Sequence, residues 1–319
     1  MSMELRWIEQ QRSVWRLRMM PLEATRAEIS LDSAALRDWE EKLKEAEDAE
    51  IRVLVIEGAG GIFCQGMDLG ARLLAYPQPS MGPSSRDEAH EIDVHYTPTP
   101  GILRALHGRT VLDEVTAAAL REDVRRYAAL LWALRKAAFA VVALVDGEVM
   151  AGGVGLMAAA DQVLATKRSR VGLPEASLGL LPAVVFPVLC ERVPAQKARW
   201  LAMRSVGMDS AEALALGLFD AVHEDADAVE KASRESLRAL LRAHPQAIAD
   251  LKRRTTETPK ASLQDALDEA AQYTASCLML PDRVEGIRRF LQGEPLPWQE
   301  RLPRREDRSH PSEPTRSSD

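Results

Sequence analysis

Cysteine is scarce in this sequence, and long hydrophobic runs are absent. The 319 residues include three cysteines, which lie far apart and form no CxxC pair, at Cys64, Cys190 and Cys277. This usage excludes a dense disulfide framework and fits a reducing compartment. The longest apolar run, Ala137–Val145, is too short to span a bilayer, and charged residues recur through the first twenty positions. We therefore expect a cytoplasmic protein with no membrane partner.

An excess of positive charge is also missing. Lys and Arg number 41 against 48 Asp and Glu, which gives a net charge of −7 and an isoelectric point near 5.6. A nucleic-acid-binding protein would show a basic face, so we expect no nucleic-acid partner. No group of Cys and His residues has the spacing of a zinc site, so we expect no metal. The apolar content of 46% is enough for one large core or two small ones.

The apolar pattern predicts strands early in the chain and amphipathic helices throughout. Strands are expected within residues 4–20 and at Arg52–Glu57. Helices are expected at Ser33–Ala49 (with Ser33 as a candidate cap), Asp113–Lys136, Pro182–Arg199, Ser210–Leu216, Ala226–Leu251 and Ser262–Leu278. In the second of these helices, Tyr127 lies on the apolar face with Leu131. Because only helices follow the last predicted αβ unit, the order indicates a sheet-based core and a helical C-terminal part.

The composition along the chain predicts its division into parts. Residues 76–101 are rich in Pro, Ser, Gly and charged residues, which is typical of a long loop or lid. With the residues that follow, they form an insertion at about 76–125. We expect a core at 1–205 that carries this insertion, and a helical region at 206–301. Residues 302–319 are rich in Arg, Ser, Pro and Glu, and we expect them to be disordered.

The most informative segment is Val141–Leu181, in which an apolar β-branched run leads into a turn of small residues. The turn, Ala151–Gly155, opens an Ala-rich helix. Backbone N–H groups at such a helix start have no intrahelical acceptor and can bind an anion. A second apolar run follows, and then Glu175 on an apolar loop. A carboxylate beside free N–H groups describes a site that holds a developing oxyanion while a base moves a proton.

Four blocks in this order resemble the crotonase, or enoyl-CoA hydratase/isomerase, superfamily. They are VLVIEGAGGIFCQGMDL at 53–69, VDGEVMAGGVGLMAAADQVLA at 145–165, PEASLGLLP at 174–182 and SAEALALGLFDAV at 210–222. The resemblance implies an α/β crotonase fold, in which repeated ββα units form a spiral core. It also implies a C-terminal helical region that trimerises, so a homotrimer or hexamer is expected.

The same resemblance implies the site residues and the substrate class. Members of the superfamily bind acyl thioesters and hold the thioester oxygen between two backbone N–H groups, which correspond here to Met67 and Gly152. Glu175 corresponds to the catalytic acid/base. No cofactor is expected besides the phosphopantetheine or CoA that carries the substrate. The residues expected to line the substrate are Gly66, Asp68 (for which a structural role is the alternative), Gly153 and Leu180.

One position departs from the pattern of the hydratases. Hydratases of the superfamily use two glutamates, and the first of them corresponds to Gly155 in this chain. Ordinary two-glutamate addition of water is therefore in doubt. A second acid could come from the inserted segment or beside it, where the candidate side chains are His90, Asp93, His95, Tyr96 and His107.

Finer features resemble the dehydratases of polyketide β-branching cassettes, which act on 3-hydroxy-3-methylglutaryl groups bound to an acyl carrier protein. These features are the AGGVG run at 151–155 and the LLPA run at 180–183. Thr25–Ala35 stands in place of the usual CoA-binding segment, which favours a carrier protein over free CoA. The sequence therefore predicts such a dehydratase. Two alternatives stay open: a double-bond isomerase that uses Glu175 alone, and a non-catalytic homologue.

Overall fold

The computed structural model describes residues 3–22, 28–68, 114–178 and 180–257, and some residues between 280 and 300. Its larger sheet has six strands in the order β1-β2-β3-β5-β7-β10. β1 pairs with β2 in antiparallel fashion, and the other neighbouring strands are parallel. The bounds are β1 (Met3–Gln11), β2 (Val14–Pro21), β3 (Val53–Glu57), β5 (Ala140–Val145), β7 (Gln162–Thr166) and β10 (Ala221–His223).

The smaller sheet has four strands in the order β4-β6-β8-β9. They are β4 (Ile62–Cys64), β6 (Glu148–Met150), β8 (Arg170–Gly172) and β9 (Met208–Asp209). The first three are parallel, and each directly follows a strand of the larger sheet along the chain. Gly147 makes one of these turns at φ +115°, where an added Cβ would lie 1.7 Å from the carbonyl oxygen of Gly61. Only glycine fits there, because the two backbone segments lie too close together to leave room for a side chain.

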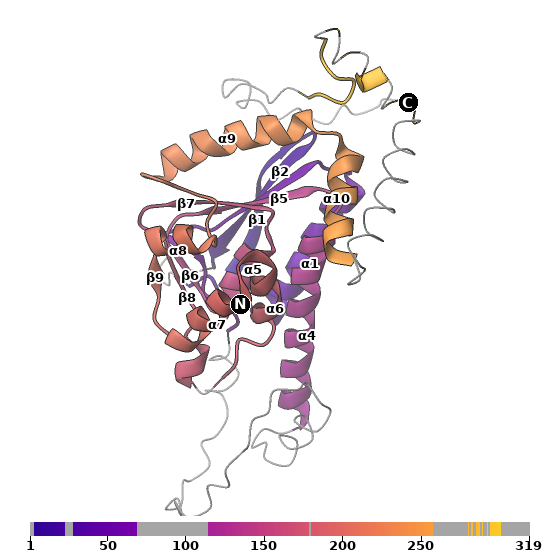
Figure 1. The fold of residues 1–319 in the computed structure, drawn as a ribbon. Helices are drawn as coiled ribbons and strands as arrows, with labels where there is room; N and C mark the ends of the chain where they lie inside the picture. Colours follow the sequence, from indigo (N-terminus) through magenta and orange to yellow (C-terminus); the bar gives the residue numbers. More distant parts are fainter. Residues whose placement is uncertain are drawn as a thin grey trace, which may run out of the picture.

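Helices cover both faces of the larger sheet (Figure 1). Their bounds are α1 (Ser33–Asp48), α4 (Glu114–Lys136), α5 (Gly152–Ala159), the 3₁₀ turn η1 (Glu175–Leu178), α6 (Val185–Arg192), α7 (Ala195–Arg204), α8 (Ser210–Leu216), α9 (Ala226–Arg242) and α10 (Pro245–Glu257). Alternate residues of β3 point to opposite faces, as in any strand. Leu54 and Ile56 pack in the core that contains Trp39 of α1, whereas Val53 and Val55 pack with Leu237 of α9. This mixed α/β arrangement confirms the predicted α/β class, whereas the spiral core of ββα units and the C-terminal trimerisation region stay predictions.

Several predicted helices have different ends in the structure. Asp32, rather than Ser33, caps α1, because its carboxylate accepts the N–H groups of Ala34 and Ala35 at 2.9 and 2.8 Å. The predicted helix at Pro182–Arg199 is two helices that meet at Pro194. The predicted helix at Ala226–Leu251 is also two, and Pro245 opens the second, at a position where proline needs no N–H acceptor.

The expectation that only helices follow the αβ units is wrong. β9 and β10 both lie beyond residue 205, and β10 pairs with β7 as the last strand of the larger sheet. Strands of two or three residues carry no readable periodicity, so the pattern could not reveal them. The division at 205/206 stays a prediction. The predicted lid at 76–101, the helix at Ser262–Leu278 and the tail at 302–319 lie outside the described residues.

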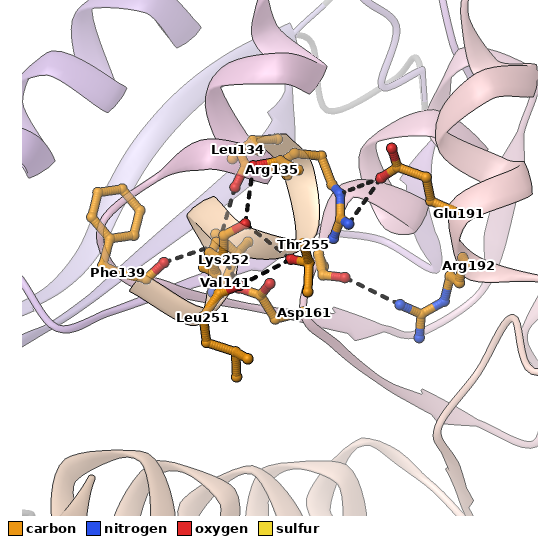
Figure 2. Close-up of polar contacts among 12 residues, drawn as sticks. Leu134, Arg135, Phe139, Val141, Asp161, Glu191, Arg192, Leu251, Lys252 and Thr255 are labelled. Carbon is orange, nitrogen blue, oxygen red and sulfur yellow. Dashed lines mark hydrogen bonds and ion pairs between the residues drawn. The ribbon is translucent and has the colours of Figure 1, made fainter. Parts of the chain in front are cut away.

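A buried lysine fastens α10 to the rest of the chain (Figure 2). The Nζ of Lys252 lies 2.6 Å from a carboxylate oxygen of Asp161, and it donates to the carbonyl oxygens of Leu134 and Phe139 at 3.1 and 3.0 Å. The same Asp161 oxygen accepts the N–H of Val141 at 2.8 Å. Asp161 therefore joins β5, the end of α5 and α10.

No helix within the described residues is long and apolar enough to cross a membrane.

Candidate active site

The predicted site residues follow three neighbouring parallel strands of the smaller sheet. Gly66 and Met67 come after β4, Gly152 and Gly153 open α5 after β6, and Glu175 comes after β8. Carboxyl ends of parallel strands meet at one edge of a sheet, where ligands of open α/β folds commonly bind. The register places Met150 beside Gly172, and the N–H of Ala151 donates to the carbonyl of Gly172 at 2.9 Å. The topology thus brings the three segments to one edge.

Gly66 and Gly152 are in direct backbone contact. Gly66 has φ +89°, and an added Cβ would lie 2.5 Å from the nitrogen of Gly152 and 2.8 Å from the Cβ of Ala151. Both the left-handed backbone and the close approach require glycine. The contact sets the distance between the loop after β4 and the start of α5.

Met67 presents a backbone N–H on the side away from Leu31. The two residues form a parallel bridge, in which the N–H of Leu31 donates to Gly66 at 2.7 Å and its carbonyl accepts from Asp68 at 3.1 Å. In such a bridge the central residue of the other strand directs its own N–H outward. No backbone acceptor among the described residues takes it.

The second predicted donor, Gly152, is the first residue of α5. Its N–H lies in the first helical turn, where the helix supplies no acceptor. The preceding residue, Ala151, has φ +49° and ψ −124°, a conformation that costs a non-glycine residue about 1–3 kcal/mol. Gly153 is fixed by packing, because an added Cβ would lie 2.1 Å from the carbonyl oxygen of Cys64. Two N–H groups from touching segments can thus face one anionic oxygen.

Glu175 carries a carboxylate that is poorly solvated. It begins η1, and its Oε2 is buried with no hydrogen-bond partner among the described residues. Burial raises the pKa of Glu175 above its ordinary value, and a hydrogen bond from its own backbone N–H partly opposes this. A carboxylate with a raised pKa and a free oxygen is a better proton acceptor than a paired one, so the geometry suits an acid/base role.

Tyr127 is a feature of the site that sequence reasoning missed. It comes from α4 and is only 2% exposed, as expected for the apolar face of that helix. Its hydroxyl, however, donates to the carbonyl oxygen of Gly152 at 2.5 Å. Burial raises the pKa of Tyr127 well above its ordinary value, and the neighbouring Cys64 and Glu175 raise it further. The sequence held one signal for this role: Tyr127 places a hydroxyl on the otherwise aliphatic face of its helix, in a chain that has glycine and no carboxylate at position 155.

The remaining predicted residues differ in their surroundings. Asp68 is half-buried and its backbone pairs with Leu31. Leu180 is 48% exposed, and its N–H donates to the carbonyl of Glu175 at 2.9 Å. Cys64 is fully buried, which raises the pKa of its thiol to about 12 and makes it a poor nucleophile. The candidate acids His90, Asp93, His95, Tyr96 and His107 lie outside the described residues.

A family model described as enoyl-CoA hydratase/isomerase matches residues 112–301, which is more than half of the chain. The chain belongs to this family. The match confirms the membership predicted from the four sequence blocks. Within the described residues there is no cluster of three or more His, Cys, Asp or Glu side chains that could hold a metal ion.

Individual relatives agree with the family model. The bacillaene synthase dehydratase PksH of Bacillus subtilis is 24% identical over 277 residues, which cover 86% of this chain and 90% of that protein. The enoyl-CoA hydratase EchA19 of Mycobacterium tuberculosis is 27% identical over 77% of this chain and 78% of its own length. The solved structure of Pseudomonas aeruginosa AtuE superposes with a TM-score of 0.72 at 28% identity, covering 94% of this chain and all of that one. Together these relatives support a hydratase or dehydratase, an enzyme of the lyase kind.

Proposed function

We propose that this protein dehydrates a β-hydroxyacyl thioester through an enolate, with Glu175 as the acid/base and the N–H groups of Met67 and Gly152 as oxyanion donors. The observation that carries the proposal is the buried Oε2 of Glu175, which has no hydrogen-bond partner among the described residues and lies at the sheet edge where Gly66 touches Gly152. A carboxylate oxygen that these residues leave unpaired is poised to take a proton from a bound molecule. Two preorganised donors can stabilise the resulting negative charge.

The reaction balances with one carboxylate. The carboxylate of Glu175 removes the proton on the carbon next to the thioester carbonyl, and the electron pair moves onto the carbonyl oxygen between the two N–H groups. The enolate then re-forms the carbonyl and expels the β-hydroxyl, which takes the proton back from Glu175 and leaves as water. The raised pKa of Glu175 suits both transfers, because the group must accept a proton and then release it.

We propose a 3-hydroxy-3-methylglutaryl group on an acyl carrier protein as the substrate, in polyketide biosynthesis. Support comes from the AGGVG and LLPA runs and from the similarity to PksH, a dehydratase named for a synthase. CoA thioesters are the competing carriers, since the family and EchA19 are named for enoyl-CoA. In either case the phosphopantetheine arm belongs to the substrate, and the proposed steps use no other cofactor.

We also propose that the protein works in the cytoplasm as a homotrimer or a hexamer. Large apolar side chains on and just after α7 support the assembly: Trp200, Met203 and Val206 are 58%, 65% and 61% exposed in the single chain. Burying such side chains against further copies of the chain would stabilise an oligomer. Sedimentation equilibrium is expected to give a trimer or hexamer for the wild type and smaller species for Met203→Glu. A wild type that sediments as a monomer would refute this assembly.

The first experiment is intact-mass analysis of a carrier protein loaded with 3-hydroxy-3-methylglutaryl-phosphopantetheine. Wild type is expected to remove one water, and Glu175→Gln is expected to remove none. The matched control is Glu224→Gln, whose exposed carboxylate pairs with Lys167, and it should keep full activity. An unchanged mass with wild type would count against dehydration of this substrate. Migration of the alkene in a CoA-bound or carrier-bound enoyl thioester leaves the mass unchanged, and its detection would then indicate the isomerase. The absence of any reaction would indicate the non-catalytic homologue.

A further inference from the structure

The Tyr127 hydroxyl occupies the space beside Gly155. A Cβ added to Gly155 would lie 2.1 Å from this hydroxyl oxygen and 3.3 Å from the ring carbon that bears it. A Cβ added to Gly152 would lie 3.4 Å from the same oxygen. The hydroxyl therefore lies against the first turn of α5, on the side where residues 152 and 155 carry no side chain.

We propose that Tyr127 is a positioning residue, whose hydroxyl fills the space beside Gly155 and fixes Gly152 for oxyanion binding. The proposal rests on the proposed function, because it assigns a task to the same oxyanion donor. With Tyr127 in place, a side chain at position 155 would clash with the hydroxyl oxygen.

Geometry argues for positioning rather than proton donation. The hydroxyl proton of Tyr127 is engaged with the carbonyl oxygen of Gly152 at 2.5 Å. The side chain is 2% exposed, enclosed by α5 and by its own helix, where Leu131 lies on the same side of Gly155. A buried phenol with an engaged proton is a poor acid toward a leaving hydroxyl. It is well placed to hold a backbone segment, because a short polar contact resists movement of the turn.

The turn needs such a support. Ala151, just before Gly152, has the unfavourable φ of +49°, and its side chain caps no N–H group of α5. A strained turn persists only when its surroundings hold it in place. The Gly66 contact holds Gly152 from the side of the β4 loop, and the Tyr127 hydroxyl holds it from α4. Loss of the second contact should let the Gly152 N–H drift from the oxyanion.

The first test removes only the hydroxyl, in Tyr127→Phe. Because a small misplacement of a catalytic group is costly, kcat is expected to fall about tenfold or more while KM changes little. A butyryl-pantetheine thioester labelled with ¹³C at the carbonyl, which lacks a leaving group, reports on the oxyanion site directly. Its infrared carbonyl stretch should shift to lower frequency on binding wild type and shift clearly less on binding Tyr127→Phe.

The control for this test is Leu134→Val on the same helix. Leu134 is fully buried, so the substitution perturbs α4 packing without touching the tyrosine hydroxyl. It is expected to lower the melting temperature but to keep the wild-type carbonyl shift and kcat. An unchanged kcat and carbonyl shift in Tyr127→Phe would overturn the proposal.

The second test is a double-mutant cycle between positions 127 and 155. Gly155→Ala in wild type forces a methyl group against the hydroxyl, so the melting temperature and kcat should both fall strongly. In the Tyr127→Phe background the closest clash is gone, so the same Gly155→Ala change should cost much less. Equal losses in both backgrounds would show that the two residues do not compete for this space.

Failure of this inference can be told from failure of the proposed function. If wild type removes no water from the loaded carrier protein, the dehydratase proposal fails. The carbonyl shift and the melting temperatures need no turnover, so they still decide whether Tyr127 positions Gly152. If wild type does dehydrate while the Tyr127→Phe shift and kcat remain at wild-type values, only the role of Tyr127 is refuted.

Discussion

The backbone nitrogen of Gly152 lies 2.5 Å from the point at which a Cβ on Gly66 would stand. The two loops that carry the proposed oxyanion donors thus touch through main-chain atoms. Because Gly66 has no side chain, main-chain contact sets the spacing of the two loops. Main-chain atoms move less freely than side chains, so this spacing can be precise.

Gly66→Ala is therefore expected to damage both activity and stability. The methyl group would push the loops apart and would also sit at φ +89°, so we expect kcat to fall about 100-fold and stability to fall about 2–4 kcal/mol. Gly60→Ala is the matched control. Gly60 also has a positive φ, +66°, but nothing lies within 4 Å of its added Cβ. Chemical denaturation and turnover should show a loss of only about 1 kcal/mol and normal activity for this control. Similar behaviour of the two variants would contradict the contact.

Glu175→Gln should separate stability from activity. The pKa of Glu175 is raised in the folded state. Ionisation of this carboxyl group therefore destabilises the fold, and the loss of stability grows as the pH rises from the ordinary pKa to the raised one. Below the ordinary pKa the group is protonated in both states and has no such effect. The glutamine variant should therefore melt at a higher temperature than wild type at pH 8 and at nearly the same temperature near pH 3.5. Turnover should be lost at every pH. For wild type, kcat/KM should rise with pH through the raised pKa. A variant that melts below wild type at pH 8 would speak against an unpartnered carboxylate.

Lys252→Met should loosen α10. The side chain of Lys252 is 7% exposed, and its ammonium group has three oxygen partners, including Asp161. Its removal takes one donor from each of these partners and leaves the Asp161 carboxylate without its cationic partner, so we expect a loss of about 2–4 kcal/mol in urea unfolding. Arg253→Met on the exposed side of the same helix, where the side chain is 56% exposed, should stay within about 0.5 kcal/mol of wild type. Equal effects of the two substitutions would mean that α10 does not dock as described.

Cys64 should resist alkylation in the native protein. Its thiol is buried beside Gly66, and a pKa raised to about 12 leaves almost no thiolate at pH 8. Peptide mapping after iodoacetamide treatment should show no label at Cys64 and faster labelling at the half-buried Cys190. In urea, both should be labelled. Rapid native labelling of Cys64 would indicate that the loop after β4 opens readily.

Local patterns in the sequence predicted much of this fold and where several of the candidate site residues lie in it. The glycine-rich helix start at Gly152 and the loop glutamate Glu175 are each legible from a few neighbouring residues, because a helix start without acceptors is a local property. The helix breaks at Pro194 and Pro245 were missed because the apolar pattern continues across them. Proline is well tolerated at the start of a helix, so its presence did not interrupt that pattern.

What the pattern could not supply was tertiary contact. Tyr127 lies 25 residues before Gly152 in the chain, and on its own helix it reads as one more core residue. Its proposed role follows from its contact with Gly152 and Gly155, which have no Cβ atoms, and only the packing shows this contact. β10 likewise acquires its strand character from pairing with β7, because three residues cannot specify a strand by themselves.

The smaller sheet sets the spacing of the candidate site, whereas the segments that follow its strands carry the proposed reactive groups. The proposed oxyanion donors follow β4 and β6, and the proposed acid/base Glu175 follows β8. Different segments would therefore carry the oxyanion binding and the acid–base chemistry. A change in the segment after β8 could move or remove the carboxylate while the backbone contact between Gly66 and Gly152 stayed intact. The same sheet edge would then keep its backbone spacing while the segment after β8 determined which group could accept a proton.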